Sequence, residues 1–326
     1  MRPSTTTLIA ILALGLFLGP RAAEAQQAGK MPRIGVMGEF FWPPFDAFRA
    51  GLRELGYVEG ENIVVEYRWS EGQTERFLAF VAEFIRHNAD VIVVWGTPAA
   101  RAAKQATTTI PIVMAATGDP IGNGLVASLQ QPGGNLTGSS SLNAALEAKR
   151  LELLKELLPT VSRVAVLWNP ALRLHQVLMQ ETQTTARALG VQLLPTEAVE
   201  AQGAAEYERA FAAMTSAGAE ALIVVQGFLL DRTQIAELAL KHRLPAVYVY
   251  RDHCEAGGLL CYAANYHALF RRAATYVDKI LKGATPGKLP VEQAMKFDLI
   301  INLKTAKALD LTIPSSLLLF ADEVIQ

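Results

Sequence analysis

The sequence has few cysteines, almost no net charge and only one long apolar run. Two cysteines are too few for the disulfide framework of a small secreted scaffold. The 30 lysines and arginines balance 31 aspartates and glutamates, so no basic excess favours nucleic acid as the main partner. An apolar content of 51% argues against extended disorder. A chain of 326 residues with this composition is expected to form about two globular domains.

The long apolar run lies at the N-terminus. Arg2 supplies a positive charge, residues 8–18 are apolar, and residues 23–25 (AEA) match a cleavage pattern. The run is too short to span about 30 Å of hydrocarbon as a helix. These features predict a cleavable signal peptide over residues 1–25, with an uncleaved anchor as the alternative. No cysteine follows the run, so we expect the mature chain to be released without a lipid anchor.

Short β-branched segments alternate with amphipathic segments along the rest of the chain. Strands are predicted at residues 33–37, 63–67, 91–95 and 110–114, with helices between them. After the segment PGGNLTGSSS the alternation begins again, with strands at 163–168, 191–194, 221–225 and 246–250. Apolar strands separated by helices indicate parallel sheets covered on both faces. The sequence therefore predicts two α/β lobes with a cleft between them, and residues 132–141 as a crossover or hinge.

Aromatic residues follow several of the predicted strands. In open parallel sheets, ligands bind beyond the carboxyl ends of the strands. Trp42, Trp95 and Trp168 are placed at such ends, where their rings can either stack on a ligand or pack the cores of the lobes.

Polar residues at the same strand ends suit a ligand that carries both a positive and a negative charge. Thr97-Pro98 predicts a helix start with Thr97 as the cap, and the free N–H groups of a helix start attract a carboxylate. Capping alone explains the pair equally well. Asp119 or Glu39 is a candidate for holding an ammonium group. An amino acid carries both of these charges.

The chemical motifs of common enzymes are absent from the sequence. It contains no G-x-S-x-G, and its five histidines show no H-E-x-x-H spacing. We expect no catalytic residue, no cofactor and no metal site. Cys254 and Cys261 flank a Gly-Gly pair, which fits a short disulfide across a hairpin, and two buried thiols are the alternative.

Five blocks of the chain resemble one family, in unbroken order. They are FRAGLRELGYVEGENI (48–63), GDPIGNGLVASLQQPGGNLTG (118–138), EAGGLLCY (255–262), LFRRAATYVDKIL (269–281) and FDLIINLKTAKALDLTIP (297–314). These blocks resemble the ABC-transporter substrate-binding proteins that include the TrpX-like tryptophan- and tyrosine-binding type. The resemblance implies an α/β fold of the type I periplasmic binding protein, with two doubly wound parallel-sheet lobes joined by a hinge of three crossings.

The resemblance also implies where the lobes and the ligand site lie. The N-terminal lobe would comprise residues 32–138 plus about 267–296, and the C-terminal lobe residues 139–266 plus about 297–326. The strand ends and the resemblance together give these candidate ligand-binding positions: Glu39, Phe40, Phe41, Trp42, Trp95, Gly96, Thr97, Thr117, Asp119, Ser139, Ser140, Asn169, Gln226 and Tyr250. Residues 40–42 (FFW) replace a segment that is often serine-rich in the family, which favours an aromatic or hydrophobic ligand.

The implied function is that of an extracytoplasmic solute-binding protein rather than an enzyme. It would capture a small molecule, such as an amino acid or an aromatic or hydrophobic carboxylate, in the cleft between the lobes. As a monomer in the periplasm it would deliver this ligand to an ABC permease in the inner membrane. A sensory protein that presents its ligand to a receptor would have the same fold and site, and a periplasmic α/β enzyme is the third possibility.

Overall fold

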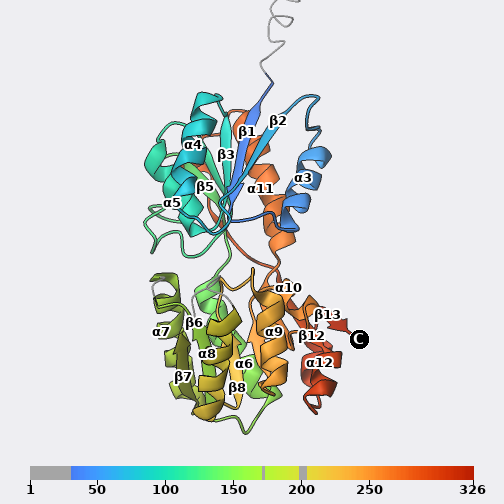
Figure 1. The fold of residues 1–326 in the computed structure, drawn as a ribbon. Helices are drawn as coiled ribbons and strands as arrows, with labels where there is room; N and C mark the ends of the chain where they lie inside the picture. The colour runs from blue at the N-terminus through green and yellow to red at the C-terminus, as the bar shows by residue number, and fades with distance from the viewer. Residues whose placement is uncertain (1–30, 171–172, 198–203) are drawn as a thin grey trace, which may run out of the picture.

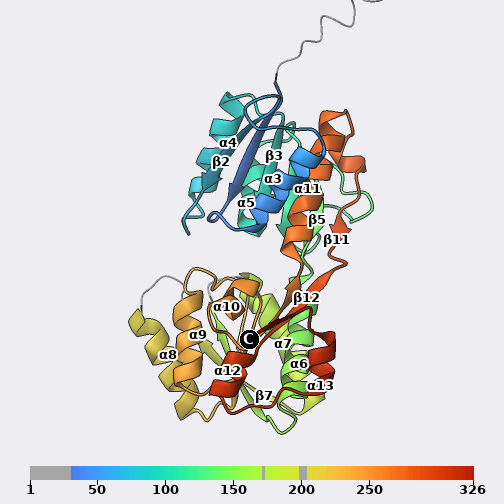
Figure 2. The same cartoon turned by 90° about the vertical axis from the view of Figure 1, so that its right-hand side faces the viewer.

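The described chain forms two lobes, each built around one β-sheet. The computed structural model describes residues 31–170, 173–197 and 204–326. The lobes lie one above the other, and helices cover both faces of each sheet (Figures 1 and 2). The signal peptide predicted for residues 1–25 lies outside the described residues. No helix in the described ranges is long and apolar enough to cross a membrane.

The first lobe contains a six-stranded sheet whose recorded pairings are all parallel. Its strands are β1 (Arg33–Gly38), β2 (Val64–Trp69), β3 (Val91–Trp95), β4 (Ile112–Thr117), β5 (Leu136–Ser140) and β11 (Glu292–Gln293), in the order β11-β5-β4-β3-β1-β2. Helices α3 (Pro44–Glu54) and α11 (Tyr266–Leu281) pack together on one face (Figure 1). Helices α4 (Arg76–Arg86) and α5 (Thr97–Ala106) cover the other.

The unbroken apolar sequence of β3 follows from this arrangement. Val91 and Val93 belong to the core beneath α3 and α11, whereas Ile92 and Val94 belong to the core beneath α4 and α5. A central strand that is buried on both faces has no solvent side on which to place a polar residue. The sheet of the first lobe therefore explains the run VIVVW.

The second lobe contains a seven-stranded, mostly parallel sheet. Its strands are β6 (Arg163–Trp168), β7 (Gln192–Glu197), β8 (Ala221–Val224), β9 (Ala246–Tyr248), β10 (Leu260–Ala264), β12 (Phe297–Asn302) and β13 (Glu323–Ile325), in the order β13-β12-β10-β9-β8-β6-β7. Only the pairing of β10 with β12 is antiparallel among those recorded for the described strands. Its helices are α6 (Asn143–Leu157), α7 (Arg173–Leu189), α8 (Ala204–Ser216), α9 (Arg232–Lys241), α10 (Arg251–Glu255), α12 (Leu303–Ala308) and α13 (Ser315–Phe320).

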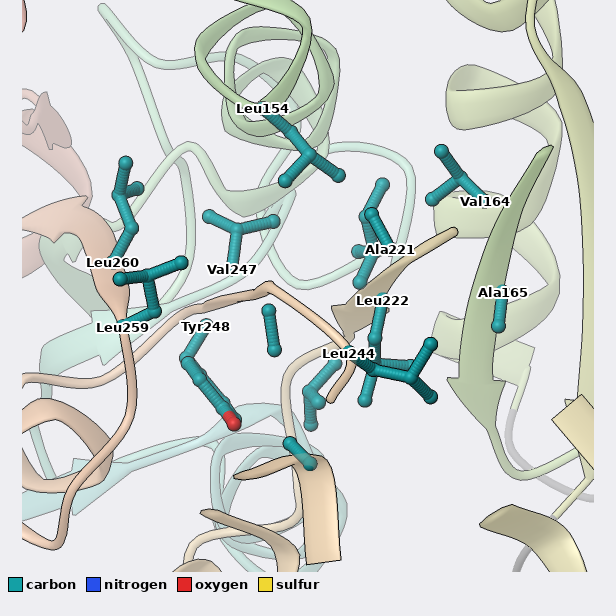
Figure 3. Close-up of a cluster of buried hydrophobic side chains, with 14 of the residues drawn as sticks. Leu154, Val164, Ala165, Ala221, Leu222, Leu244, Val247, Tyr248, Leu259 and Leu260 are labelled. Atoms are coloured by element: carbon teal, nitrogen blue, oxygen red, sulfur yellow. The ribbon is translucent and has the colours of Figure 1, made fainter. Parts of the chain in front are cut away.

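The core of the second lobe is formed where α6 packs on the central strands. Leu154 of α6 points toward the side chains of the sheet, among them Val164 of β6 and Val247 of β9 (Figure 3). All three side chains are buried. Burying a side chain of this size contributes about 1.5–3 kcal/mol to the free energy of unfolding.

The chain passes between the lobes three times. It crosses after β5, between β10 and α11, and between β11 and β12. A buried arginine joins two of the elements that adjoin these crossings: Arg150 of α6 donates to the carbonyl oxygen of Tyr262 in β10 (2.8 Å) and is paired with Glu147 of its own helix (2.6 Å). Because three chain segments join the lobes, the lobes move relative to each other by bending of these segments.

The segment 132–141, predicted as a crossover, contributes a strand to the first sheet. Its residues Leu136–Ser140 form β5 between β4 and β11. Gly138 has φ of +127°, and a Cβ atom at this position would lie 2.2 Å from the Met114 carbonyl oxygen, so only glycine fits there. Backbone pairing with β11 continues through Ser139 and Ser140. The chain therefore leaves the first lobe after residue 140, two residues beyond the lobe boundary predicted between residues 138 and 139.

Other predicted elements form with shifted ends. The helix start at Thr97-Pro98 is confirmed, but the cap residue is Gly96, whose φ of +85° is favourable only for glycine, and the Thr97 hydroxyl makes no capping bond. The strand predicted at 246–250 ends at Tyr248.

Cys254 and Cys261 are joined by a disulfide, but it connects helix α10 to strand β10 rather than the two arms of a hairpin.

Candidate ligand-binding cleft

The carboxyl ends of the central strands of the two sheets face each other across the boundary between the lobes (Figure 1). The loop that follows β1 carries Trp42, and the loop that follows β9 carries Tyr250. Their rings are in contact, with centroids 5.4 Å apart and an edge-on geometry. The strand ends predicted to form a ligand site are thus brought together by the fold.

Four aromatic side chains meet at this boundary and are called here the interlobe aromatic cluster: Trp42, Trp95, Tyr250 and Tyr266. Trp42 stacks on Trp95 (4.9 Å between centroids) and meets Tyr266 edge-on (4.7 Å). Trp42 is only 4% exposed. Because protein surrounds its ring, Trp42 packs the two lobes together in this arrangement instead of presenting a free face to a ligand.

Trp42 also forms a polar bond between the lobes. Its indole N–H donates to the carboxylate of Asp252 at the start of α10, with both oxygens 3.1 Å from Nε1. Helix α10 is in turn linked to the crossing strand β10 by the Cys254–Cys261 disulfide. Sequence reasoning placed Asp252 just beyond the predicted strand 246–250 but did not include it among the ligand-binding positions.

Three of the predicted site residues lie just before Trp42. Phe40 meets Trp95 edge-on at 5.2 Å, at the border of the interlobe aromatic cluster. Phe41 points away from the cluster: it is 48% exposed and contacts Trp69 of β2. Burial raises the pKa of the Glu39 carboxyl above its ordinary value. Glu39 is partly buried, and within the described ranges no side-chain hydrogen bond or ion pair to its carboxyl is found.

The loops after β3 and β4 lie against each other. The Thr97 hydroxyl is 3.5 Å from the Gly118 carbonyl oxygen, which places the start of α5 beside the loop after β4. In that loop one carboxylate oxygen of Asp119 accepts the Gly122 N–H (2.9 Å) and closes a tight turn. Asp119 is therefore already used in local structure, which makes Glu39 the better candidate for an ammonium group.

The remaining predicted residues of the first lobe are buried in strands. The Thr117 hydroxyl points to the sulfur of Met114 (3.1 Å), and both Ser139 and Ser140 are buried in β5. For the buried Ser139 hydroxyl, the described part of the chain offers no hydrogen-bond partner. Ser139 therefore has a fully buried polar group that is available to a ligand.

In the second lobe, a histidine joins the two loops that carry Asn169 and Gln226. The Nδ1 atom of His175 accepts the backbone N–H of Asn169 (2.8 Å), and its Nε2 lies 2.5 Å from the carbonyl oxygen of Gln226. Burial lowers the pKa of His175 to about 4, so the imidazole is neutral near pH 7. No spacing in the sequence distinguishes His175 from the other histidines, so sequence reasoning could not find it.

A separate groove of about 470 Å³ lies on the hinge side of the interlobe aromatic cluster. Its lining includes Asp252, Asn265 and Asp298. Trp42 also lines it and is the one predicted ligand-binding residue that does so. The acidic side chains Asp252 and Asp298 already bond to Trp42 and Asn265. Across residues 31–170, 173–197 and 204–326, no group of three His, Cys, Asp or Glu side chains could hold a metal ion.

The fold is that of a two-lobed α/β protein whose strand ends meet at the lobe boundary, and comparison with known proteins identifies its family. The chain belongs to the family of ABC transporter substrate binding proteins, whose model matches residues 44–325. A curated tyrosine-binding protein of Clostridioides difficile (strain R20291) is 26% identical to this chain over 287 residues. The match covers 86% of this chain and 82% of that protein.

Solved structures share the whole two-lobed fold. A conserved domain protein from Vibrio cholerae is 30% identical, with a TM-score of 0.83 over 90% of this chain and 100% of that one. An ABC domain from Streptococcus pneumoniae in complex with L-Trp is 27% identical, with a TM-score of 0.82 over 91% and 100%. The ligand-free, open structure of the substrate binding protein CD0873 from Clostridium difficile is 25% identical, with a TM-score of 0.69 over 90% and 99%.

Replacing Trp42 by Phe is expected to favour separation of the lobes. Phe keeps most of the ring packing but removes the N–H that donates to Asp252, and a hydrogen bond to a charged group contributes about 1.5–3 kcal/mol. The ligand-free Trp42→Phe variant should show a larger radius of gyration in small-angle X-ray scattering. An unchanged radius together with a lower melting temperature would instead show that Trp42 only packs the core of the first lobe.

Acidification is expected to destabilise the protein through His175. Its pKa is about 4 in the folded protein and about 6.5 in the unfolded chain, so between these values the unfolded chain binds more protons. Titration of His175 leaves the free energy of unfolding unchanged above pH 6.5. As the pH falls from 6.5 toward 4, it lowers this free energy by up to about 3 kcal/mol. Urea unfolding between pH 7 and 4.5 checks this. In His175→Gln this component of the pH dependence should be absent, and identical pH profiles would contradict it.

Proposed function

We propose that this chain is a periplasmic receptor that captures an aromatic α-amino acid in the interlobe cleft and delivers it to an ABC permease, without catalysing a reaction. Membership of the ABC transporter substrate binding family supports the transport role. The relatives named for tyrosine and for bound L-Trp support the ligand class, because both ligands are aromatic amino acids. The predicted signal peptide supports export.

The observation that carries the ligand class is the partly buried, unpaired carboxyl of Glu39, which precedes Phe40 in the loop after β1. A carboxylate removed from water is costly unless a cation pairs with it. The α-ammonium group of an amino acid supplies that cation. The next residue, Phe40, is only partly buried and lies at the border of the interlobe aromatic cluster, where its ring can meet an aromatic side chain. The first turn of α5 offers the backbone N–H of Thr97 to the α-carboxylate, because the Gly96 N–H already donates to the Ala116 carbonyl oxygen (3.1 Å).

Binding would be coupled to delivery by bending at the three crossings. A ligand that contacts both lobes stabilises the closed arrangement in proportion to its preference for that form. The structure of this chain is nearer to the L-Trp complex than to the ligand-free open structure, although the two relatives are almost equally identical to it. This difference supports a closed arrangement in which Asn169 and Gln226 of the second lobe can complete the site.

The ligand class is tested by thermal unfolding of the chain from Gln26 to Gln326 with a panel of solutes. The panel contains L-tryptophan, L-tyrosine, L-leucine, glucose and the analogues tryptamine and indole-3-propionate. An aromatic amino acid at 100 times its dissociation constant should add about 2.7 kcal/mol and raise the melting temperature by about 5 °C. Shifts from L-leucine or glucose alone, or from no member of the panel, would contradict the proposal.

The role of Glu39 is tested with Glu39→Gln. Loss of the carboxylate should weaken binding of L-tryptophan by about 10- to 100-fold, the range for an ion-paired hydrogen bond. Indole-3-propionate lacks the ammonium group, so its affinity, measured by calorimetry, should change little. The ligand-free variant should be at least as stable as the wild type, because an uncompensated charge has been removed. Equal losses for both ligands would assign Glu39 a structural role.

A further inference from the structure

His175 lies in the second lobe between the backbones of Asn169 and Gln226, two residues predicted to bind the ligand. It lies in the first turn of α7, directly after the loop that follows β6, and is only 1% exposed. The neighbouring residue, Leu174, faces the first lobe: its Cδ1 atom is 3.9 Å from the position of a Cβ on Gly118. The turn that carries His175 therefore adjoins the loop after β4 at the boundary between the lobes.

The two hydrogen bonds of His175 require one protonation state of the ring. A backbone N–H can only donate, so Nδ1, which faces the N–H of Asn169, must carry no proton. A carbonyl oxygen can only accept, so Nε2, which faces the carbonyl of Gln226, must carry the proton. Each ring nitrogen thus holds the backbone of a different loop.

The surroundings of His175 are shaped to hold the ring at this position. Gly227 follows Gln226 with φ of +119°, and a Cβ there would come within 3.1 Å of Nε2. The absence of a side chain at residue 227 lets the imidazole approach the backbone of the loop. The ring of Phe228 packs on the imidazole, with centroids 5.7 Å apart.

We propose that His175 is a positioning residue of the ligand site, which holds the loops after β6 and β8 at a fixed separation. Strands β6 and β8 are neighbours in the sheet, but their pairing stops at Leu167 and Val224. Beyond that point the imidazole replaces the missing backbone pairing. It thereby sets where Asn169 and Gln226 can meet a ligand bound to the first lobe. This inference rests on the proposed function for the identity of the ligand.

Three substitutions separate the two bonds. In His175→Asn the amide oxygen can still accept from Asn169, in His175→Gln the amide nitrogen can still donate to Gln226, and in His175→Phe both bonds are lost. Thr182→Val is the matched control: Thr182 is buried on the same helix, and its hydroxyl bonds to the Leu178 carbonyl oxygen (2.7 Å) away from the cleft. The control removes a buried hydrogen bond without touching either loop.

Affinity for L-tryptophan and L-tyrosine is measured by calorimetry at a temperature at which every variant is folded. We expect His175→Phe to weaken binding at least 30-fold, His175→Asn and His175→Gln to weaken it by about 3- to 10-fold, and Thr182→Val to leave it within twofold. This graded rescue is not expected of a side chain that only stabilises the lobe. An affinity for His175→Phe equal to that of the Thr182→Val control would overturn the proposal.

Amide hydrogen exchange of the ligand-free proteins gives a second readout that needs no ligand. The N–H of Asn169 should exchange faster in His175→Phe and His175→Gln, and residues 226–228 should exchange faster in His175→Phe, whereas β6 stays protected. Unchanged exchange of both loops would also overturn the proposal. If the wild type binds neither amino acid, the proposed ligand is wrong, and the exchange data alone then decide whether His175 holds the loops.

Discussion

The packing of Trp42 between the two lobes is the contact on which the arrangement of the cleft depends. Its ring lies against Trp95 of its own lobe and Tyr250 of the other, and its N–H donates to Asp252. Apolar burial is not directional, whereas the indole bond has a defined geometry. Together they bring the strand ends of the two sheets into one site, and any opening of the lobes must separate them.

Each side of the cleft is supported by a contact deeper in its lobe. In the second lobe, His175 joins the loops of Asn169 and Gln226, and the Cys254–Cys261 disulfide anchors the helix that carries Asp252. In the first lobe, the parallel sheet presents the loops after β1, β3 and β4 at one edge. A binding protein that closes by hinge bending needs such rigid lobes, because a loose lobe would not transmit the ligand's preference for the closed form.

The local pattern of apolar and polar residues predicted the alternation of strands and helices well wherever a segment is amphipathic or buried on both faces. It failed at residues 132–141, where Gly, Pro and Ser residues indicate a loop but β5 forms, because sheet pairing with β4 and β11 outweighs low strand propensity. It also missed α10, whose five residues are too few for helical periodicity to show. For the candidate site, the pattern predicted the strand ends but not the direction of the side chains. Phe41 and Trp42 are adjacent in the sequence, yet Trp42 is buried and Phe41 is exposed.

The sequence by itself determined the fold class, the two-lobed organisation and the family, because apolar periodicity and contiguous blocks of residues are local properties of the chain. Only the tertiary structure decided which polar groups are free for a ligand. Trp42 is engaged by a residue 210 positions away, His175 by one 51 positions away, and Asp119 by its own turn, while Glu39 has no such partner within the described ranges. Contacts over such separations are set by how the two sheets and their helices pack, and no local pattern of residues records them.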